Sequence, residues 1–212
     1  MLNLRRYYNP VGRRRKRYEM MCRLLMLRPE DTILSVGSGA GLSFEVFNDS
    51  NPITGIDIQD VSPLADRPNF SYVRRTEDRL PFGDRSFDVV ICIGVLEHLP
   101  EPELLRTTCA EIQRVGSRYL ALVPNYWTVI EPHYSFPFFQ LLPEAWQTAL
   151  TERFGLRYAG HGEAKIYEKM VYKRTRDWLA LFPGARRTVY WHIGPLITNL
   201  IIYRDQSGAA LG

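Results

Sequence analysis

Three glycines at alternating positions follow a short apolar run in 33-ILSVGSGAGL-42. Gly37 permits a sharp exit from a strand, Gly39 lets a ligand approach bare backbone, and Gly41 lets a following helix start close to a sheet. The spacing G-x-G-x-G differs from the dinucleotide pattern G-x-G-x-x-G, and no Gly-Lys-Ser/Thr follows, which excludes a P-loop. The segment therefore favours a ligand-binding loop over its alternative, a glycine turn without a ligand.

An acidic residue stands near the end of the next apolar run, 53-ITGIDI-58. Asp57 lies sixteen residues beyond Gly41, and the carboxyl edge of a parallel sheet would point its side chain at the glycine loop. One carboxylate can accept hydrogen bonds from both vicinal hydroxyls of a ribose. An Asp at a strand end can also cap a helix or form a turn. Paired with the glycine loop, Asp57 predicts a ribose contact.

Two further segments combine a glutamate with a histidine and could move a proton. Glu97 and His98 follow the longest apolar run, and Glu131 and His133 stand two residues apart in 131-EPH-133. The ordinary pKa of histidine, about 6.5, suits removal of a proton from a hydroxyl. We predict His133, beside Glu131, as the first candidate base and His98 as the second, with a structural role as the alternative for Glu97 and His98. A Mg²⁺ site is the weaker interpretation, because no Asp/Asn cluster supplies octahedral oxygen ligands.

Apolar runs alternate with helical patterns over the first 125 residues, and these predict the elements that position the polar groups. Strands are expected at 32–37, 53–58, 70–73, 87–96 and 118–125. Helical spacing marks residues 13–27, ended by Pro29, and residues 101–115. The unbroken run 87–96 is typical of a central parallel strand covered on both faces. This alternation favours an α/β fold with a parallel sheet.

The sequence changes after Pro124 to an aromatic stretch interrupted by prolines, 124-PNYWTVIEPHYSFPFFQLLP-143. These prolines forbid a long helix, and an irregular segment of this length is typical of a lid or a binding loop. We expect residues 125–143 to close over a substrate and to contact it through Asn125, Tyr126, Trp127 and Tyr134. The elements expected after it are helices at 144–153 and 175–182, strands at 187–193 and 196–203, and a disordered tail at 206–212.

Composition and charge bound the class of protein. The chain has 212 residues, 45% of them hydrophobic, and a net charge of +4. Residues 1–28, a basic segment and helix, carry nine Arg or Lys and one Glu, a local charge of +8, so the remainder carries −4. The acidic remainder makes nucleic acid an unexpected partner. The basic segment predicts peripheral contact of residues 1–17 with an anionic membrane. No apolar run reaches the roughly 20 residues of a membrane span, and we expect one cytoplasmic domain over residues 29–205.

The segments 36-VGSGAG-41, 55-GIDI-58 and above all 80-LPFGDRSFDVVICIGVLEHLP-100 resemble the class I S-adenosylmethionine-dependent methyltransferases, in particular the natural-product and cofactor subgroup. The resemblance covers about residues 30–125. It implies a Rossmann-like, doubly wound, mostly parallel seven-stranded sheet with helices on both faces, whose seventh strand inserts antiparallel beside the sixth. It also implies S-adenosyl-L-methionine as the cofactor.

The same resemblance implies which residues contact that cofactor. The matching positions, of which the last two would face its methionine end, are Gly37, Ser38, Gly39, Gly41, Asp57, Ile58, Thr76, Glu77, Ile93 and Gly94. Asp57 would take the ribose hydroxyls, and Ile58 would pack on the adenine. The family usually carries an Asp-Ala-Glu-type triplet before LPF. Here that triplet begins with Thr76 and Glu77, so the adenine contact passes to one of these two residues.

By this resemblance we expect methyl transfer to an oxygen of a small molecule or of a lipid-linked sugar. No Asn/Asp-Pro-Pro-Tyr motif of amino-methylating enzymes follows the fourth strand, which favours a hydroxyl acceptor. Two alternatives stay open: an RNA methyltransferase that uses the basic N-terminal segment, and a non-catalytic protein that binds the cofactor.

Overall fold

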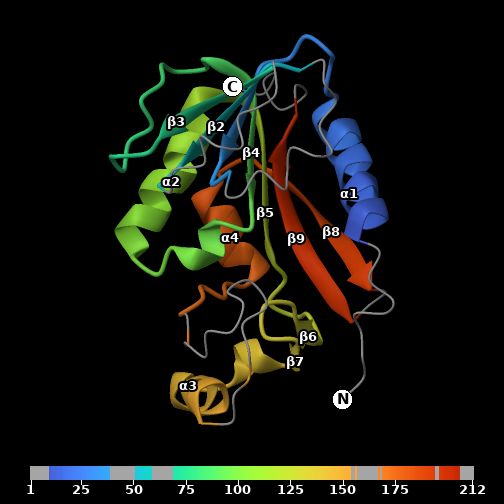
Figure 1. Ribbon diagram of the computed structural model, residues 1–212, viewed down its shortest axis with the longest axis vertical. Helices are drawn as coiled ribbons and strands as arrows, with labels where there is room; N and C mark the ends of the chain where they lie inside the picture. The colour runs from blue at the N-terminus through green and yellow to red at the C-terminus, as the bar shows by residue number, and fades with distance from the viewer. Residues whose placement is uncertain are drawn as a thin grey trace.

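A seven-stranded sheet forms the centre of the molecule (Figure 1), with the strand order β3-β2-β1-β4-β5-β9-β8. The structure is a computed structural model that describes residues 10–38, 51–58, 69–153, 156, 167, 169–193 and 196–205. Five strands pair in parallel: β1 (Ile33–Val36), β2 (Ile53–Asp57), β3 (Phe70–Arg74), β4 (Phe87–Ile93) and β5 (Gly116–Pro124). The last strand, β9 (Ile197–Arg204), inserts antiparallel between β5 and β8 (Arg186–Ile193). The predicted mostly parallel seven-stranded sheet is thus confirmed.

Residues 87–93 of the apolar run predicted as a strand at 87–96 form β4 in the middle of this sheet, and Gly94 ends the strand. Val90 and Cys92 belong to the core on one face of the sheet, and Val89 and Ile91 to the core on the other. All four side chains are buried. A central strand that is covered on both faces needs apolar residues at every position, which explains why the sequence shows no alternation.

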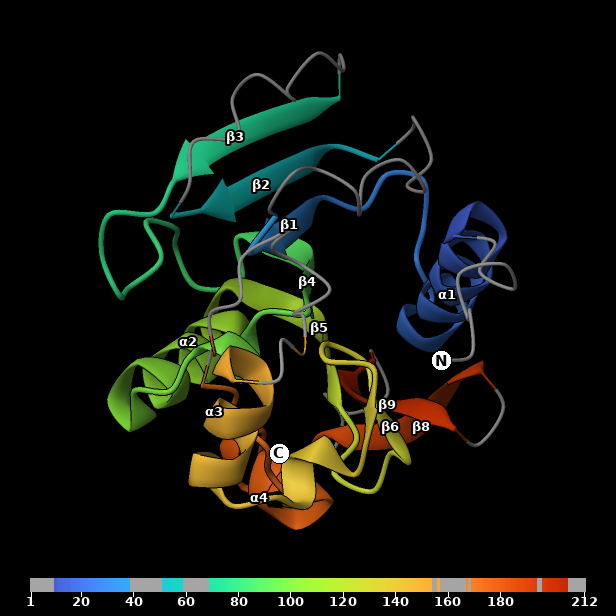
Figure 2. The same cartoon turned by 60° about the horizontal axis from the view of Figure 1, so that its bottom comes forward.

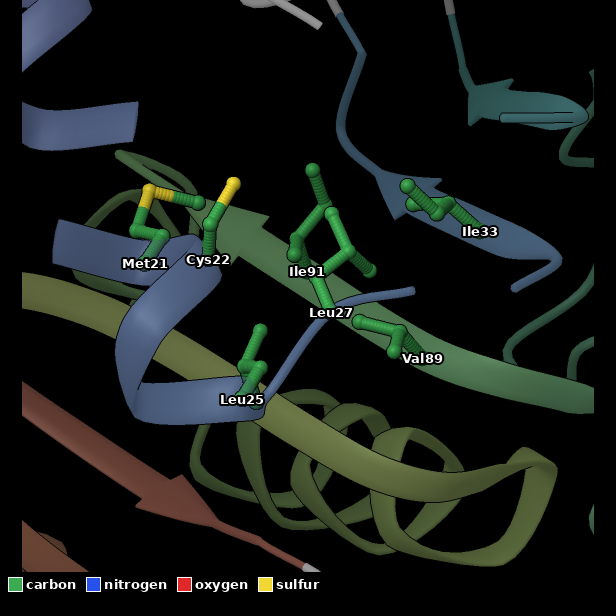
Figure 3. A pocket seen from close by; sticks show the side chains of 7 residues that line it. All are labelled: Met21, Cys22, Leu25, Leu27, Ile33, Val89 and Ile91. Carbon is green, nitrogen blue, oxygen red and sulfur yellow. The ribbon is translucent and has the colours of Figure 1, made fainter. Parts of the chain in front are cut away.

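Helices cover both faces of the sheet. The helices α2 (Pro102–Val115) and α4 (Thr175–Leu181) pack on one face, where Trp178 is fully buried. The helix α1 (Pro10–Leu25) packs on the other face, as Figure 1 shows. In Figure 3, Met21 and Leu25 of α1 lie over Val89 and Ile91 of β4. Each such buried aliphatic side chain contributes about 1.5–3 kcal/mol through the hydrophobic effect.

The end of α1 differs from the sequence prediction. We expected Pro29 to end a helix over residues 13–27, but α1 ends at Leu25. Met26 adopts the left-handed conformation, with φ +48°, and donates its N–H to the carbonyl of Arg23. The N–H of Leu27 then donates to the carbonyl of Cys22 at 2.9 Å. These two bonds form a Schellman motif, which usually has glycine in place of Met26, so the sequence carries no obvious stop signal there.

A buried ion pair fixes α1 to the sheet. Arg118 is the third residue of β5, and its Nη2 lies 2.6 Å from Oδ1 of Asp31. Its guanidinium also donates to the carbonyls of Leu25 (2.7 Å) and Met26 (3.0 Å), at the end of α1. The end of α1 is therefore held at the start of β5. Because the helix packs along the sheet, its first turns point toward the carboxyl edge, where β5 ends.

The segment after β5 has more structure than we expected from its prolines. It forms β6 (Ile130–Glu131), β7 (Phe136–Pro137), the 3₁₀ turn η5 (Phe139–Leu141) and α3 (Glu144–Glu152). The buried amide of Gln140 donates to the carbonyls of Tyr126 (3.0 Å) and Thr128 (2.7 Å), which holds the two halves of the segment together. Figure 2 shows β6 and α3 at the end of the sheet where β5 ends. The expectation of an irregular loop is corrected accordingly.

The remaining elements agree with the sequence prediction within two residues at each end. The helices predicted at 144–153 and 175–182 correspond to α3 and α4. The strands predicted at 187–193 and 196–203 correspond to β8 and β9. The predicted tail at 206–212 lies outside the described residues. Among the helices that the structure describes, none has both the length and the apolar character needed to cross a membrane.

Candidate active site

The first glycine of the loop and the predicted ribose contact share the carboxyl edge of the sheet. Gly37 directly follows β1 with φ +70°, and its N–H donates to the carbonyl of Ile56 at 2.8 Å. This bond ties the loop to the end of β2, where Asp57 follows. A Cβ atom on Gly37 would lie 2.2 Å from Cγ2 of Val95, so both the conformation and the space require glycine.

Further features of this edge fit a nucleoside ligand. Ser38 is buried, and in the described part of the chain its hydroxyl has no hydrogen-bond partner. Ile58, just beyond β2, is 69% exposed and presents an apolar surface. Thr76 and Glu77 are exposed in the segment after β3, and Glu77 lines a hollow with residues 79–82. A polar hydroxyl, an apolar platform and an acid at a strand end suit S-adenosylmethionine. Gly39 and Gly41 lie outside the described residues.

The end of β4 leads directly to a buried acid. After Ile93, the last residue of β4, Gly94 turns the chain with φ +68° and donates its N–H to the carbonyl of Leu122 at 3.2 Å. The 3₁₀ turn η4 (Leu96–His98) follows. It buries Glu97 and leaves His98 half-buried. The predicted candidate base His98 therefore stands at the same edge as the glycine loop.

The second Glu-His pair forms a direct hydrogen bond. Nδ1 of His133 lies 2.6 Å from Oε1 of Glu131, whose side chain is completely buried. The other carboxylate oxygen, Oε2, accepts a hydrogen bond from the N–H of Tyr134 at 2.7 Å. Both oxygens of Glu131 are thus engaged, so the carboxylate holds the imidazole ring in one orientation. Such a carboxylate partner selects the tautomer and directs Nε2 away from it.

The two pairs meet. Nε2 of His133 lies 3.9 Å from Oε1 of Glu97, and the rings of His98 and His133 contact edge to face at 5.4 Å. Burial raises the pKa of Glu97, while His133 and then His98 oppose that shift. Oε2 of Glu97 is buried and has no partner in the described residues. One ligand atom each of Glu97, His98 and His133 lie within 4.8 Å of one another, a spacing that a metal ion could also bridge.

Tyr172 is a neighbour of this cluster that the sequence analysis missed. Burial, and after it the charge of Glu131, raise the pKa of the Tyr172 phenol. The adjoining N–H of Val171 donates to the carbonyl of Glu97 at 2.7 Å. Residues 171–172 therefore form one wall of the cluster. They follow a stretch without a regular pattern, so the sequence contained no signal for this contact.

The four predicted substrate contacts divide into two kinds. Asn125 uses both ends of its side chain within the fold, because its amide N–H donates to Thr198 (3.0 Å) and its oxygen accepts from the N–H of Trp127 (3.2 Å). Tyr134 is buried and stacks on Phe139 at 4.1 Å. We therefore interpret Asn125 and Tyr134 as residues that hold the segment. Tyr126 and Trp127 remain the candidates for direct contact.

The central part of the chain is similar to known methyltransferases. Residues 34–120 match the family model described as a methyltransferase domain. The ubiquinone biosynthesis O-methyltransferase of Saccharophagus degradans is 32% identical over 96 residues, which cover 41% of this chain and 41% of that protein. The chain thus spans about two fifths of the length of the curated relatives it matches.

Solved structures show the same architecture. A SAM-dependent methyltransferase from Methanosarcina mazei superimposes with a TM-score of 0.57 at 19% identity, over 84% of this chain and 92% of that one. Another, from Aquifex aeolicus, gives 0.55 at 14% identity, over 94% and 95%. The chain thus has the fold of these methyltransferases, and the family match over residues 34–120 supports S-adenosylmethionine as its cofactor.

Proposed function

We propose that this chain transfers the methyl group of S-adenosylmethionine to a hydroxyl oxygen of a small molecule or of a lipid-linked sugar. The observation that carries the proposal is the Glu131–His133 hydrogen bond of 2.6 Å, beside Glu97 and His98 at the carboxyl edge of the sheet. The sulfonium of the bound cofactor supplies an already activated methyl group. The protein then has to align the acceptor, exclude water and take up one proton.

His133 is the proposed proton acceptor. When Nε2 takes the hydroxyl proton, the resulting imidazolium lies between Glu131 at 2.6 Å and Glu97 at 3.9 Å. A carboxylate on either side favours the charged ring, which strengthens the base at the moment of transfer. His98, in edge-to-face contact with His133, is the second candidate. Tyr126 and Trp127 are the proposed contacts for the acceptor.

The acceptor atom is inferred from two sources. The curated relatives are named as O-methyltransferases, and a histidine held by a carboxylate suits deprotonation of a hydroxyl. An RNA acceptor would depend on the basic residues 1–28, since the chain beyond residue 28 carries a net charge of −4. That charge favours a small acceptor.

The proposed cofactor contacts are Gly37, Ser38, Gly39, Gly41, Asp57, Ile58, Thr76, Glu77, Ile93 and Gly94. We expect Asp57→Ala to weaken S-adenosylmethionine binding by about 1.5–3 kcal/mol, since it removes hydrogen bonds to a charged acceptor. Isothermal titration calorimetry measures the change. Glu30→Ala, exposed before β1 at the opposite edge of the sheet, is the matched control and should bind as the unaltered protein does. Equal affinity of all three proteins would remove Asp57 from the site.

The activity is tested by following S-adenosylhomocysteine formation with a panel of phenols, catechols and polyprenyl-linked sugars, and with RNA in parallel. Turnover with a hydroxylated small molecule supports the proposal. Turnover with RNA alone would favour the RNA alternative, and cofactor binding without turnover on any acceptor would favour a non-catalytic protein.

A further inference from the structure

The segments at the carboxyl edge of the sheet carry several large apolar side chains that are exposed. We call this set the aromatic rim; its members are Trp127, Phe138, Leu141, Trp146, Trp191 and Leu196. Trp127 and Trp146 are 65% and 66% exposed, although tryptophan is normally one of the more buried residues. Exposed apolar residues scattered singly are ordinary, but a group of them on one face marks an interaction surface.

Hydrogen bonds join the segments that carry the rim. The carbonyl of Leu196, in the turn between β8 and β9, accepts from the N–H of Ile130 at 2.8 Å. The N–H of Phe138 donates to the carbonyl of Val129 at 2.8 Å, beside Trp127 in the chain. The rim therefore spans neighbouring segments, at the end of the sheet where Figure 2 shows β6, β8 and β9 together.

One member of the aromatic rim has an unusual backbone conformation. Phe138 has φ +53°, the left-handed region that bulky residues rarely adopt, and its side chain is about half exposed. Folding does not require an aromatic residue there, since glycine would adopt this conformation without strain. Strain of this kind is typical of functional surfaces.

Cations lie at the same edge. Because Arg118 holds the end of α1 at the start of β5, the first turns of that helix point toward the rim. Arg15 and Lys16 are exposed there, and Figure 1 shows the start of α1 near the end of β8. On the other side of the rim, the guanidinium of Arg174 lies 5.7 Å from the ring centre of Tyr126. Positive charge thus flanks the exposed aromatic residues.

We propose that the carboxyl edge docks on an anionic lipid bilayer, with the aromatic rim in the headgroup region and the flanking cations against the phosphates. Tryptophan favours this interface because its ring is apolar while its N–H keeps a polar partner. Lysine and arginine are attracted to the negative surface potential. The same edge carries the methyl-transfer site. If the proposed function holds, an acceptor dissolved in the bilayer can therefore reach His133 without crossing water.

Vesicle co-sedimentation of the full chain tests the docking without any use of activity. We expect partition onto vesicles of phosphatidylglycerol and phosphatidylcholine, much weaker partition onto phosphatidylcholine alone, and a decrease as salt is raised. The double variant Trp127→Ser/Trp146→Ser should lose about tenfold in partition, since bilayer binding scales with buried apolar area. Met26→Ser is the matched control, because Met26 is 47% exposed at the opposite edge of the sheet.

A second pair of variants isolates the charge. Arg15→Gln/Lys16→Gln should weaken binding to the anionic vesicles, while Arg85→Gln, before β4 at the opposite edge, should not. Absence of binding to anionic vesicles would overturn the proposal, as would equal losses in the rim and control variants. Concentration-dependent dimers in light scattering that disappear in Trp127→Ser/Trp146→Ser, without vesicle binding, would assign the rim to self-association and also overturn it. Vesicle binding without methyl transfer would leave the docking intact and contradict only the proposed function.

Discussion

His133→Ala should lower kcat about 10²–10⁴-fold, the contribution typical of a general base, while the Kd for S-adenosylmethionine stays unchanged. The reason is geometric: Nδ1 of His133 is held by Glu131 at 2.6 Å, so Nε2 is the atom presented to the acceptor. Glu131→Gln keeps the shape but lowers the basicity of the ring, and we expect a smaller loss. Steady-state kinetics with the best acceptor from the panel, combined with calorimetry for the cofactor, separates the two effects.

Ser135→Ala, exposed in the same segment, is the matched control and should retain full activity. A larger loss in His98→Ala than in His133→Ala would exchange the roles of the two histidines. If His133→Ala raised only KM, the residue would bind the acceptor without taking its proton. Dialysis against a chelator should leave the activity intact. Loss of activity that added Zn²⁺ restores would assign Glu97, His98 and His133 to a metal instead.

Arg118→Leu should lower the free energy of unfolding by about 3–5 kcal/mol, because it leaves the buried carboxylate of Asp31 without its cation. The same change removes the donor to the carbonyls of Leu25 and Met26. Urea denaturation followed by circular dichroism measures the loss. Arg106→Ala breaks an exposed pair with Glu103 on α2 and should cost at most about 1 kcal/mol.

A double variant distinguishes a lost charge pair from lost packing. Adding Asp31→Asn to Arg118→Leu removes the uncompensated charge, so part of the stability should return. If the double variant is no more stable than Arg118→Leu, the cost comes from the orphaned carbonyls and the cavity. A loss below about 1 kcal/mol in Arg118→Leu would contradict a buried anchor.

Local pattern was enough to predict the parallel part of the sheet. The runs that became β1 and β4 are apolar at nearly every position, as strands must be when helices cover both faces. The order of the strands along the chain also placed Gly37 and Asp57 at one edge, since parallel strands connected through crossovers all end on the same side. These features depend on spacing within short segments, which a single sequence displays directly.

Where tertiary contacts override a local signal, the sequence prediction was less accurate. Pro29 is a strong local stop, but α1 ends earlier because the Met26 and Leu25 carbonyls are bound by Arg118, more than ninety residues away in the chain. The prolines after Pro124 predicted irregular backbone. Instead, the buried amide of Gln140 donates hydrogen bonds to the carbonyls of residues 126 and 128, which makes the segment compact. No local sequence pattern indicates these two hydrogen bonds.

The sequence by itself determined the α/β sheet, the glycine loop and the position of Asp57, because each follows from composition and spacing within about thirty residues. It also singled out Glu131, His98 and His133 by residue type. Only the tertiary structure decided that Glu97 and His133 face each other at 3.9 Å and that Glu131 is fully buried beside them. The physical reason is that these contacts join η4 to the segment after β5. How that segment folds over the sheet edge depends on packing and hydrogen bonds between residues far apart in the chain, such as Thr128 with Leu196.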